Sequence, residues 1–140
     1  MIYLSDLLEV AGMRSGSEEL PERFSGFAFD SRRVREGDLF VAMRTDRGDG
    51  HEFIADALAG GAAAVLCERW DGDGGPTILS DDPLEAVRRY AELAISRFGS
   101  RIVAIAGSAG KTSTREFATH ILAGHFEVFR NPENFNDLVG

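Results

Sequence analysis

The stretch RIVAIAGSAGKTST at 101–114 constrains the fold more than any other part of the sequence. Its first six residues form an apolar run of the length of a buried strand, and a glycine-bounded loop at 107–110 follows at once. A helix is then expected from Lys111 to Ala123, before a stop at Gly124. A strand, a glycine loop and a helix in this order predict an α/β fold. The helix is expected to face its core with Phe117, Ala118, Ile121 and Leu122.

The glycine loop has the composition of a phosphate-binding loop. Glycines let the backbone approach an anion closely, and the first amides of the helix, with its dipole, favour negative charge. Lys111 is the only lysine, since the other fourteen basic residues are arginine. Its compact ammonium fits a tight loop around phosphates better than a planar guanidinium does, and Thr112 offers a hydroxyl to Mg²⁺. The alternative is an ordinary Gly-Ser turn, because the longer pattern G-x4-G-K-[ST] requires glycine where Ile105 stands.

The rest of the chain alternates short strands with helices. Strands are expected at 24–31, 37–43, 62–67, 77–80 and 126–129, and helices at 5–12 and 51–61. A longer helix should begin after Asp82, with Pro83 in its first turn, and end at Gly99. The boundary between two parts of the chain is therefore expected near residue 81.

Composition excludes several classes of function. The net charge of −8 argues against nucleic acid or an anionic membrane as a partner. Apolar runs are far shorter than the roughly 20 residues that span a bilayer, and the first residues lack the pattern of a signal peptide. The single cysteine, Cys67, lies in an apolar run and is expected to be buried and inert. We therefore expect a cytoplasmic protein without membrane insertion.

A second block of polar residues lies in the first half of the chain. Asp30, Ser31 and Arg32 follow an expected strand, and Arg44 and Arg47 flank the end of the next one. Two such loops could hold a sugar nucleotide, with arginine near its diphosphate; the alternative is an ordinary turn and a solvated arginine face. His51 is expected to order its loop rather than to do chemistry.

The order DSR…V…GDLFVA…DGH.FI..A, followed by GS.GKTST, resembles the Mur ligase family over nearly the whole chain. The resemblance implies a small N-terminal Mur-type α/β domain at 1–81, followed by the start of a P-loop central ATPase domain at 82–140. The segment NPENFNDLVG is similar to the motif G-N-x-N-N-x-x-G of the D-alanyl-D-alanine-adding branch. Here Glu133 replaces a glycine and Asp137 the second asparagine of the pair.

The resemblance also implies the site residues. Those expected to bind the UDP part of UDP-N-acetylmuramoyl-peptide are Ser31, Arg32, Asp46, Arg47 and Gly48. Those expected to bind ATP are Gly107, Ser108, Ala109, Gly110, Lys111, Thr112 and Ser113, joined by Asn134 and Asn136 in the central cleft. Lys111 is the expected catalytic side chain and Thr112 the expected Mg²⁺ ligand.

The implied activity is that of an ATP-dependent amide ligase of peptidoglycan precursor synthesis. It would add D-alanyl-D-alanine to UDP-N-acetylmuramoyl-tripeptide through an acyl-phosphate, as a monomer. Alternatives are the diamino-acid-adding branch of the family, a non-catalytic UDP-sugar-binding module and an unrelated phosphate-loop kinase. Because no later strand ends in an acidic metal ligand, we expect these 140 residues to be a fragment without activity of its own.

Overall fold

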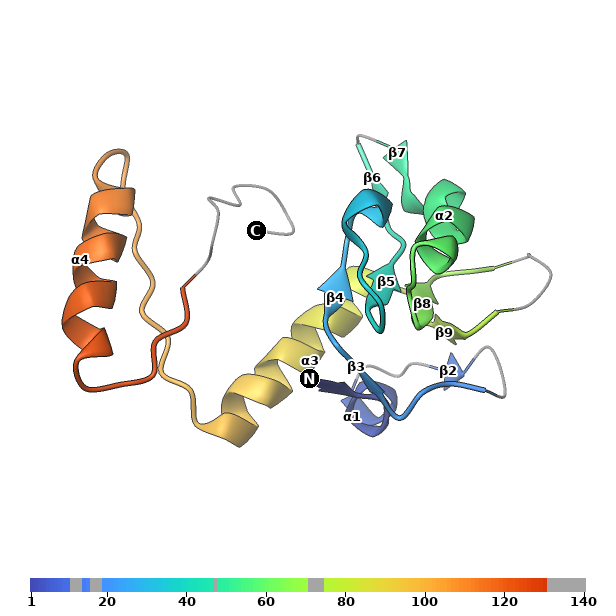
Figure 1. Ribbon diagram of the computed structural model, residues 1–140, viewed down its shortest axis with the longest axis horizontal. Helices are drawn as coiled ribbons and strands as arrows, with labels where there is room; N and C mark the ends of the chain where they lie inside the picture. The colour runs from blue at the N-terminus through green and yellow to red at the C-terminus, as the bar shows by residue number, and fades with distance from the viewer. Residues whose placement is uncertain (11–13, 16–18, 47, 71–74, 131–140) are drawn as a thin grey trace. The chain divides into compact units, whose positions relative to one another are not determined.

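The structure is a computed structural model that describes residues 1–10, 14–15, 19–46, 48–70 and 75–130 (Figure 1). The chain divides into two compact units, Met1–Ser100 and Arg101–Gly140. They are referred to below as unit 1 and unit 2, and each is described by itself.

Unit 1 is built on a five-stranded sheet. Its order is β2 (Arg14–Ser15), β9 (Thr77–Leu79), β8 (Ala64–Cys67), β5 (Leu39–Val41) and β4 (Phe27–Ala28). Strands β4, β5, β8 and β9 run parallel, and β2 pairs with β9 in the antiparallel sense. Two small antiparallel pairs accompany the sheet: β1 (Ile2–Tyr3) with β3 (Arg23–Phe24), and β6 (Arg44–Thr45) with β7 (Gly48–Asp49). The parallel sheet confirms the α/β class expected from the sequence.

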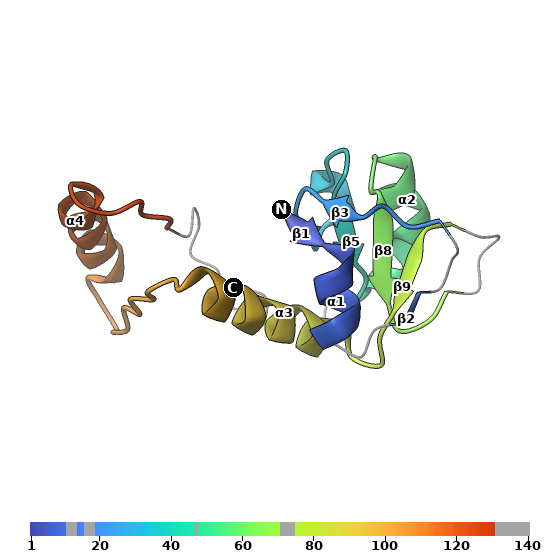
Figure 2. The ribbon, with the colours of Figure 1, turned by 90° about the horizontal axis from the view of Figure 1, so that it is seen from below.

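Helices cover both faces of this sheet, which is why its central strands β5 and β8 are apolar without interruption. On one face, Leu39, Val41 and Leu66 pack with α1 (Leu4–Val10) and α3 (Pro83–Phe98). On the other face, Phe40 and Val65 pack with α2 (Ile54–Ala59). Figure 2 shows α1 and α3 together on one side of β8 and α2 on the other. Cys67, buried as expected, belongs to the α2 side of this core.

The ends of α3 follow their sequence signals. Asp82 accepts a hydrogen bond from the Glu85 backbone N–H at 2.9 Å, and Gly99 closes the helix with a left-handed φ of 60°. Ala86 and Tyr90 of α3 are buried in the core of unit 1. An ion pair of 2.7 Å joins Arg97 to Asp6 of α1. Because α3 packs in this way, the compact units divide after Ser100, whereas the ATP-binding domain was expected to begin at residue 82.

Unit 2 contains α4, which runs from Lys111 to Ala123 as predicted. The predicted strands at 101–106 and 126–129 are wrong, since the structure has no strand in either segment. Ile102 and Val103 are 68% and 65% exposed, and Phe117 and Ile121 of α4 are exposed as well, against the expected inward face. The physical reason is that a strand needs a neighbouring strand, and no described residue of unit 2 belongs to one. Throughout the described ranges, every helix is too short or too polar to span a bilayer.

Candidate functional site

The two loops predicted to bind UDP leave neighbouring strands at one edge of the sheet. Strands β4 and β5 are parallel and in register, with Phe27 opposite Leu39 and Ala28 opposite Phe40. Their carboxyl ends lead into the turn η1 (Ser31–Arg33) and into the β6–β7 hairpin, which Figure 1 shows at the same end of the sheet. In open α/β sheets, ligands bind in the crevice outside the carboxyl ends of the strands.

The η1 turn is organised by Asp30. One carboxylate oxygen, Oδ1, accepts hydrogen bonds from the Arg32 backbone N–H at 3.1 Å and from Arg32 Nε at 2.9 Å. The other, Oδ2, accepts from Arg32 Nη2 at 2.7 Å. The side-chain hydrogen bond from Arg32 is the main reason why the pKa of Asp30 falls from 3.8 to about 2. The guanidinium of Arg32 is 86% exposed, and a bidentate pair with Asp30 occupies one of its edges.

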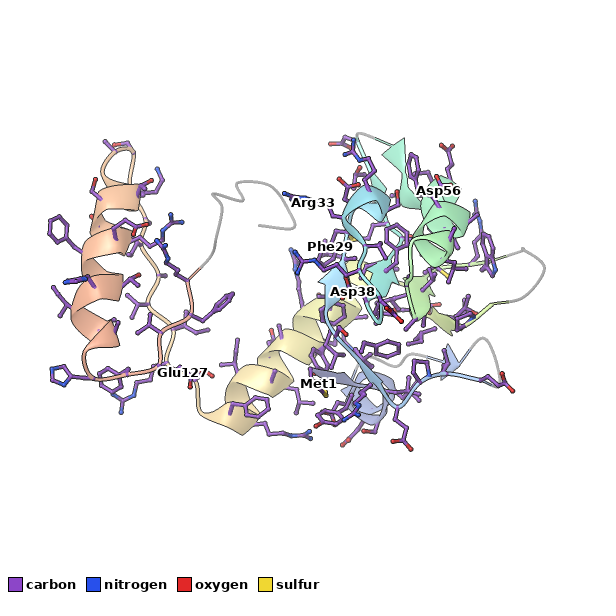
Figure 3. All side chains as sticks on the ribbon, viewed as in Figure 1. Met1, Phe29, Arg33, Asp38, Asp56 and Glu127 are labelled. Atoms are coloured by element: carbon purple, nitrogen blue, oxygen red, sulfur yellow. The ribbon has the colours of Figure 1, made fainter. Side chains whose placement is uncertain are left out.

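Two other side chains stand beside this turn. Ser31 is partly exposed at its start. Phe29, the last residue before Asp30, exposes 38% of its surface, and Figure 3 labels it beside β4. The edge therefore combines a hydroxyl, a paired cation and an apolar ring, which together suit a ligand with both polar and aromatic parts.

The second loop is the β6–β7 hairpin. Arg44 is paired with Asp49, and Thr45 with Gly48. Asp46 is exposed at the turn, whereas Arg47 lies outside the described residues. Asp49 accepts hydrogen bonds from Arg44 Nε at 3.1 Å and from the His51 backbone N–H at 3.0 Å. The bonds from His51 are the main cause that lowers the pKa of Asp49 from 3.8 to about 2.

The glycine loop of unit 2 presents the start of α4 to solvent. Gly110 precedes the helix with a φ of 77°, a left-handed angle that glycine adopts without strain, and no side chain caps the first amides. Lys111 folds back, and its Nζ donates a hydrogen bond of 2.5 Å to the Gly107 carbonyl. Ser108, Ala109, Thr112 and Ser113 are exposed. Open amides and an ammonium at one helix terminus can together bind the phosphates of a nucleotide.

The remaining predicted site residues divide into two groups. Asn134 and Asn136 lie outside the described residues, as does the whole asparagine-rich segment. Thr112 stands at the first turn of α4 with an exposed side chain. In the parts of the chain that the structure describes, no three His, Cys, Asp or Glu side chains gather into a metal site. A Mg²⁺ ion at this loop would take one ligand from the protein, the hydroxyl of Thr112. Its other ligands would be phosphate oxygens of the nucleotide and water, as is usual at nucleotide sites.

Asp30 and Asp49, the partners of the predicted residues, are not among the site residues expected from the sequence. In both cases an aspartate stands two residues before a basic side chain, Arg32 or His51, and accepts a hydrogen bond from the backbone N–H of that residue. This spacing is typical of Asx turns, and it is the sequence pattern from which the roles of Asp30 and Asp49 could be predicted. His51 does order its loop, as expected, through the bond that it makes with Asp49.

Comparison with known proteins shows which family this chain resembles. A model of the "Mur ligase family, catalytic domain" matches residues 23–94. The chain is 33% identical over 118 residues to the UDP-N-acetylmuramoyl-tripeptide–D-alanyl-D-alanine ligase of Bacillus subtilis, covering 82% of this chain and 26% of that protein. It is 40% identical over 108 residues to the UDP-N-acetylmuramoyl-L-alanyl-D-glutamate–2,6-diaminopimelate ligase of Syntrophomonas wolfei, covering 74% of this chain and 22% of that protein.

A solved structure shows the same likeness in three dimensions. The MurF ligase of Thermotoga maritima, crystallised in complex with ADP, superposes with a TM-score of 0.68 and 36% sequence identity. The superposition covers 81% of this chain and 26% of that enzyme. The chain thus spans about a quarter of the length of the relatives that it matches. The matched family model, the parallel sheet and the two loops at its carboxyl edge lead to one conclusion: this chain belongs to the Mur ligase family.

Proposed function

We propose that this chain supplies the UDP-substrate-binding and ATP-binding parts of an ATP-dependent amide ligase. This ligase would add D-alanyl-D-alanine to UDP-N-acetylmuramoyl-tripeptide. In this proposal unit 1 binds the UDP part of the substrate and unit 2 binds ATP with Mg²⁺. The protein would act as a monomer in the cytoplasm, in the synthesis of peptidoglycan precursors. One observation carries the proposal. The two predicted UDP-binding loops follow the carboxyl ends of two adjacent parallel strands, β4 and β5.

The UDP moiety would lie across the carboxyl ends of β4 and β5. Ser31 would contribute a hydroxyl, and Arg32 the free edge of a guanidinium that Asp30 already orients. On the other side, Asp46 and Gly48 of the hairpin would approach the ligand through their backbone, with Arg47 near the diphosphate. Preorganised donors of this kind favour binding, because little side-chain freedom remains to be lost when the ligand arrives.

ATP would bind at the start of α4, with its phosphates against the amides that follow Gly110. Lys111 would exchange its bond with the Gly107 carbonyl for a charge-assisted bond to the phosphates. Thr112 would hold Mg²⁺, which supplies charge neutralisation to the phosphoryl group when bound. The ADP complex of the related Thermotoga maritima enzyme supports the assignment of an adenine nucleotide. The transferred phosphoryl group would activate the terminal carboxylate of the substrate peptide for attack by the amine.

Ligand-dependent melting of the chain tests the division between the two units. UDP-N-acetylmuramoyl-tripeptide and Mg-ATP are added separately, each at about 100 times its dissociation constant, which should raise the melting temperature by roughly 10 °C. We expect each ligand to produce a shift. A response to ATP alone would argue against the proposed UDP site of unit 1, and a response to the UDP ligand alone would favour a binding module without turnover.

A chimaera tests the reaction itself. Residues 1–140 replace the aligned segment of the Bacillus subtilis ligase, and phosphate release is measured with ATP, Mg²⁺, UDP-N-acetylmuramoyl-tripeptide and D-alanyl-D-alanine. We expect amide product with this pair of substrates. A chimaera that folds, binds both nucleotides and forms no product would contradict the proposed activity.

The diaminopimelate-adding branch is a second candidate, because the Syntrophomonas wolfei relative reaches 40% identity over its matched region. The two branches use different UDP substrates, as the names of the relatives state. Titration of the chain with the muramoyl-dipeptide and the muramoyl-tripeptide therefore separates them. Tighter binding of the tripeptide supports the D-alanyl-D-alanine branch, and tighter binding of the dipeptide supports the other.

A further inference from the structure

The β6–β7 hairpin is too small to hold its own shape. Each strand has two residues, and Arg44, Thr45, Asp46 and Gly48 are exposed. An isolated two-stranded hairpin is at best marginally stable in water. One side-chain bond within the hairpin is weak: Thr45 Oγ1 donates to the Gly48 carbonyl at 3.3 Å. Its conformation must therefore be fixed from the body of unit 1.

That connection runs through the carboxylate of Asp49. On the side of the hairpin, Oδ2 accepts from Arg44 Nε at 3.1 Å. On the side of the body, Oδ1 accepts from the His51 backbone N–H at 3.0 Å and lies 2.6 Å from His51 Nδ1. An ionised carboxylate only accepts hydrogen bonds, so the Nδ1–H of His51 donates. The exposed fraction of the side chains falls from 48% at Arg44 through 30% at Asp49 to 12% at His51.

The inner end of this chain of contacts packs against the body of unit 1. His51 belongs to the turn η2 (Gly50–Phe53), which leads directly into α2 and its fully buried Ile54. Gly50 donates to the Met43 carbonyl at 2.8 Å, and a Cβ at Gly50 would lie 2.8 Å from both the Met43 nitrogen and oxygen. The turn thus packs closely against the backbone that follows β5. Through its bonds to His51 and Arg44, Asp49 links the hairpin to this turn.

We propose that Asp49 is a positioning residue for substrate binding, which holds Asp46 and Gly48 in their binding conformation by joining Arg44 to His51. The inference rests on the proposed function, since it concerns the UDP site of unit 1. It assigns a role to a residue that need not touch the ligand. It also predicts that Arg44 and Asp49 act as one unit, so that loss of either has the effect of losing both.

The test uses two variants with a matched control. Asp49→Asn keeps a good cap for η2, since asparagine can accept from the His51 N–H, but its uncharged amide no longer provides an anionic partner for Arg44. Arg44→Gln breaks the same pair from the other side. Asp56→Asn removes the same charge from the exposed surface of α2, where Figure 3 labels Asp56. Binding of UDP-N-acetylmuramoyl-tripeptide to each chain is measured by calorimetry, and the melting temperature without ligand is recorded.

The expected result is a loss of about twofold to fivefold in affinity for Asp49→Asn and for Arg44→Gln, as for one exposed ion pair. The double variant should be no weaker than the weaker single variant, because the two residues form one pair. Asp56→Asn should bind like the unmodified chain, and without ligand Asp49→Asn and Arg44→Gln should lower the melting temperature by only a few degrees, as for an exposed ion pair. A residue with a purely structural role would lower the melting temperature by much more, together with the affinity.

Other outcomes overturn the inference in distinguishable ways. If the unmodified chain binds the ligand and Asp49→Asn binds it equally well, the positioning role is wrong while the proposed function stands. Losses that add up in the double variant would show two independent residues and would also refute it. If Asp49→Asn melts at a much lower temperature, Arg44→Gln decides: weaker binding at a melting temperature within a few degrees of the unmodified chain supports the inference, and unchanged binding overturns it. If the unmodified chain does not bind the ligand, the proposed function fails and the inference fails with it.

Discussion

Units 1 and 2 contain the same kind of sequence signal with different results. In unit 1 the apolar run at 64–67 became β8, a fully buried strand between β5 and β9. In unit 2 the equally apolar run at 101–106 formed no strand, and its Ile102 and Val103 are exposed. Helices formed in both units, because α3 and α4 are specified by local signals at their ends. An apolar run therefore becomes a strand only where the chain supplies at least one neighbouring strand.

The largest expected effect comes from truncating isoleucine in each unit. Ile78 of β9 is fully buried, whereas Ile121 of α4 is 67% exposed. Ile78→Ala should lower the free energy of unfolding by roughly 2–5 kcal/mol, because it leaves a cavity in the core. Ile121→Ala should change it by about 0.5 kcal/mol or less. Urea unfolding followed by Trp70 fluorescence and far-UV circular dichroism measures both, and equal losses would mean that the exposed face of α4 is covered in solution.

A smaller effect is expected on ligand binding by unit 2. Lys111→Ala should weaken Mg-ATP binding by roughly 1.5–3 kcal/mol, the contribution of a charged hydrogen bond. Lys111→Arg should also weaken it, because the guanidinium fork is too wide for the loop. Arg101→Ala, which removes an exposed cation from the same unit, serves as the control. Calorimetry with Mg-ATP and with the UDP substrate checks the separation of the units: a change in UDP affinity in Lys111→Ala would break it.

The corresponding change in unit 1 should be smaller still. Ser31→Ala removes one neutral hydroxyl from the proposed UDP site and should weaken binding of the UDP substrate by roughly 0.5–1.5 kcal/mol. Mg-ATP binding should not change. Ser96→Ala, at an exposed position of α3, is the matched control. Equal losses for both ligands would argue against two separate sites.

The smallest effect concerns acid titration of unit 1. The pKa values of Asp30 and Asp49 are each lowered from 3.8 to about 2. Groups with a depressed pKa contribute stability that is fully present above about 3.8 and is lost as the pH falls through about 2. Carboxyl ¹³C shifts recorded between pH 6 and pH 1.5 should therefore show midpoints near 2 for both residues. Midpoints near 3.8 would mean that the pairs with Arg32, Arg44 and His51 do not persist in solution.

Local features of the fold were predictable, and pairings between distant segments were not. The limits of α3 and α4 follow from Asp82, Gly99, Gly110 and Gly124, which act on their own neighbours. The antiparallel addition of β2 to β9 depends on partners more than sixty residues apart, and no local pattern specifies it. The strands predicted at 101–106 and 126–129 failed for the same reason.

The candidate site shows the same division. The sequence was sufficient to select Ser31 and Arg32 as a loop at a strand end, and the structure places them there. It did not reveal that the guanidinium of Arg32 is already paired with Asp30, because the choice of an ion-pair partner depends on side-chain geometry. The roles of Arg47, Asn134 and Asn136 stay predictions, since these residues lie outside the part of the chain that is described.

The buried thiol of Cys67 makes opening of the unit 1 sheet measurable by chemical modification. This residue is the only cysteine of the chain and lies in β8, in the middle of the sheet. Burial, with a smaller contribution from Glu68, raises the pKa of its thiol to about 11. Because the reactive species is the thiolate, a reagent at neutral pH can modify Cys67 only during the moments when the sheet opens. The rate of modification therefore reports how often β8 separates from its neighbours, without any engineered label.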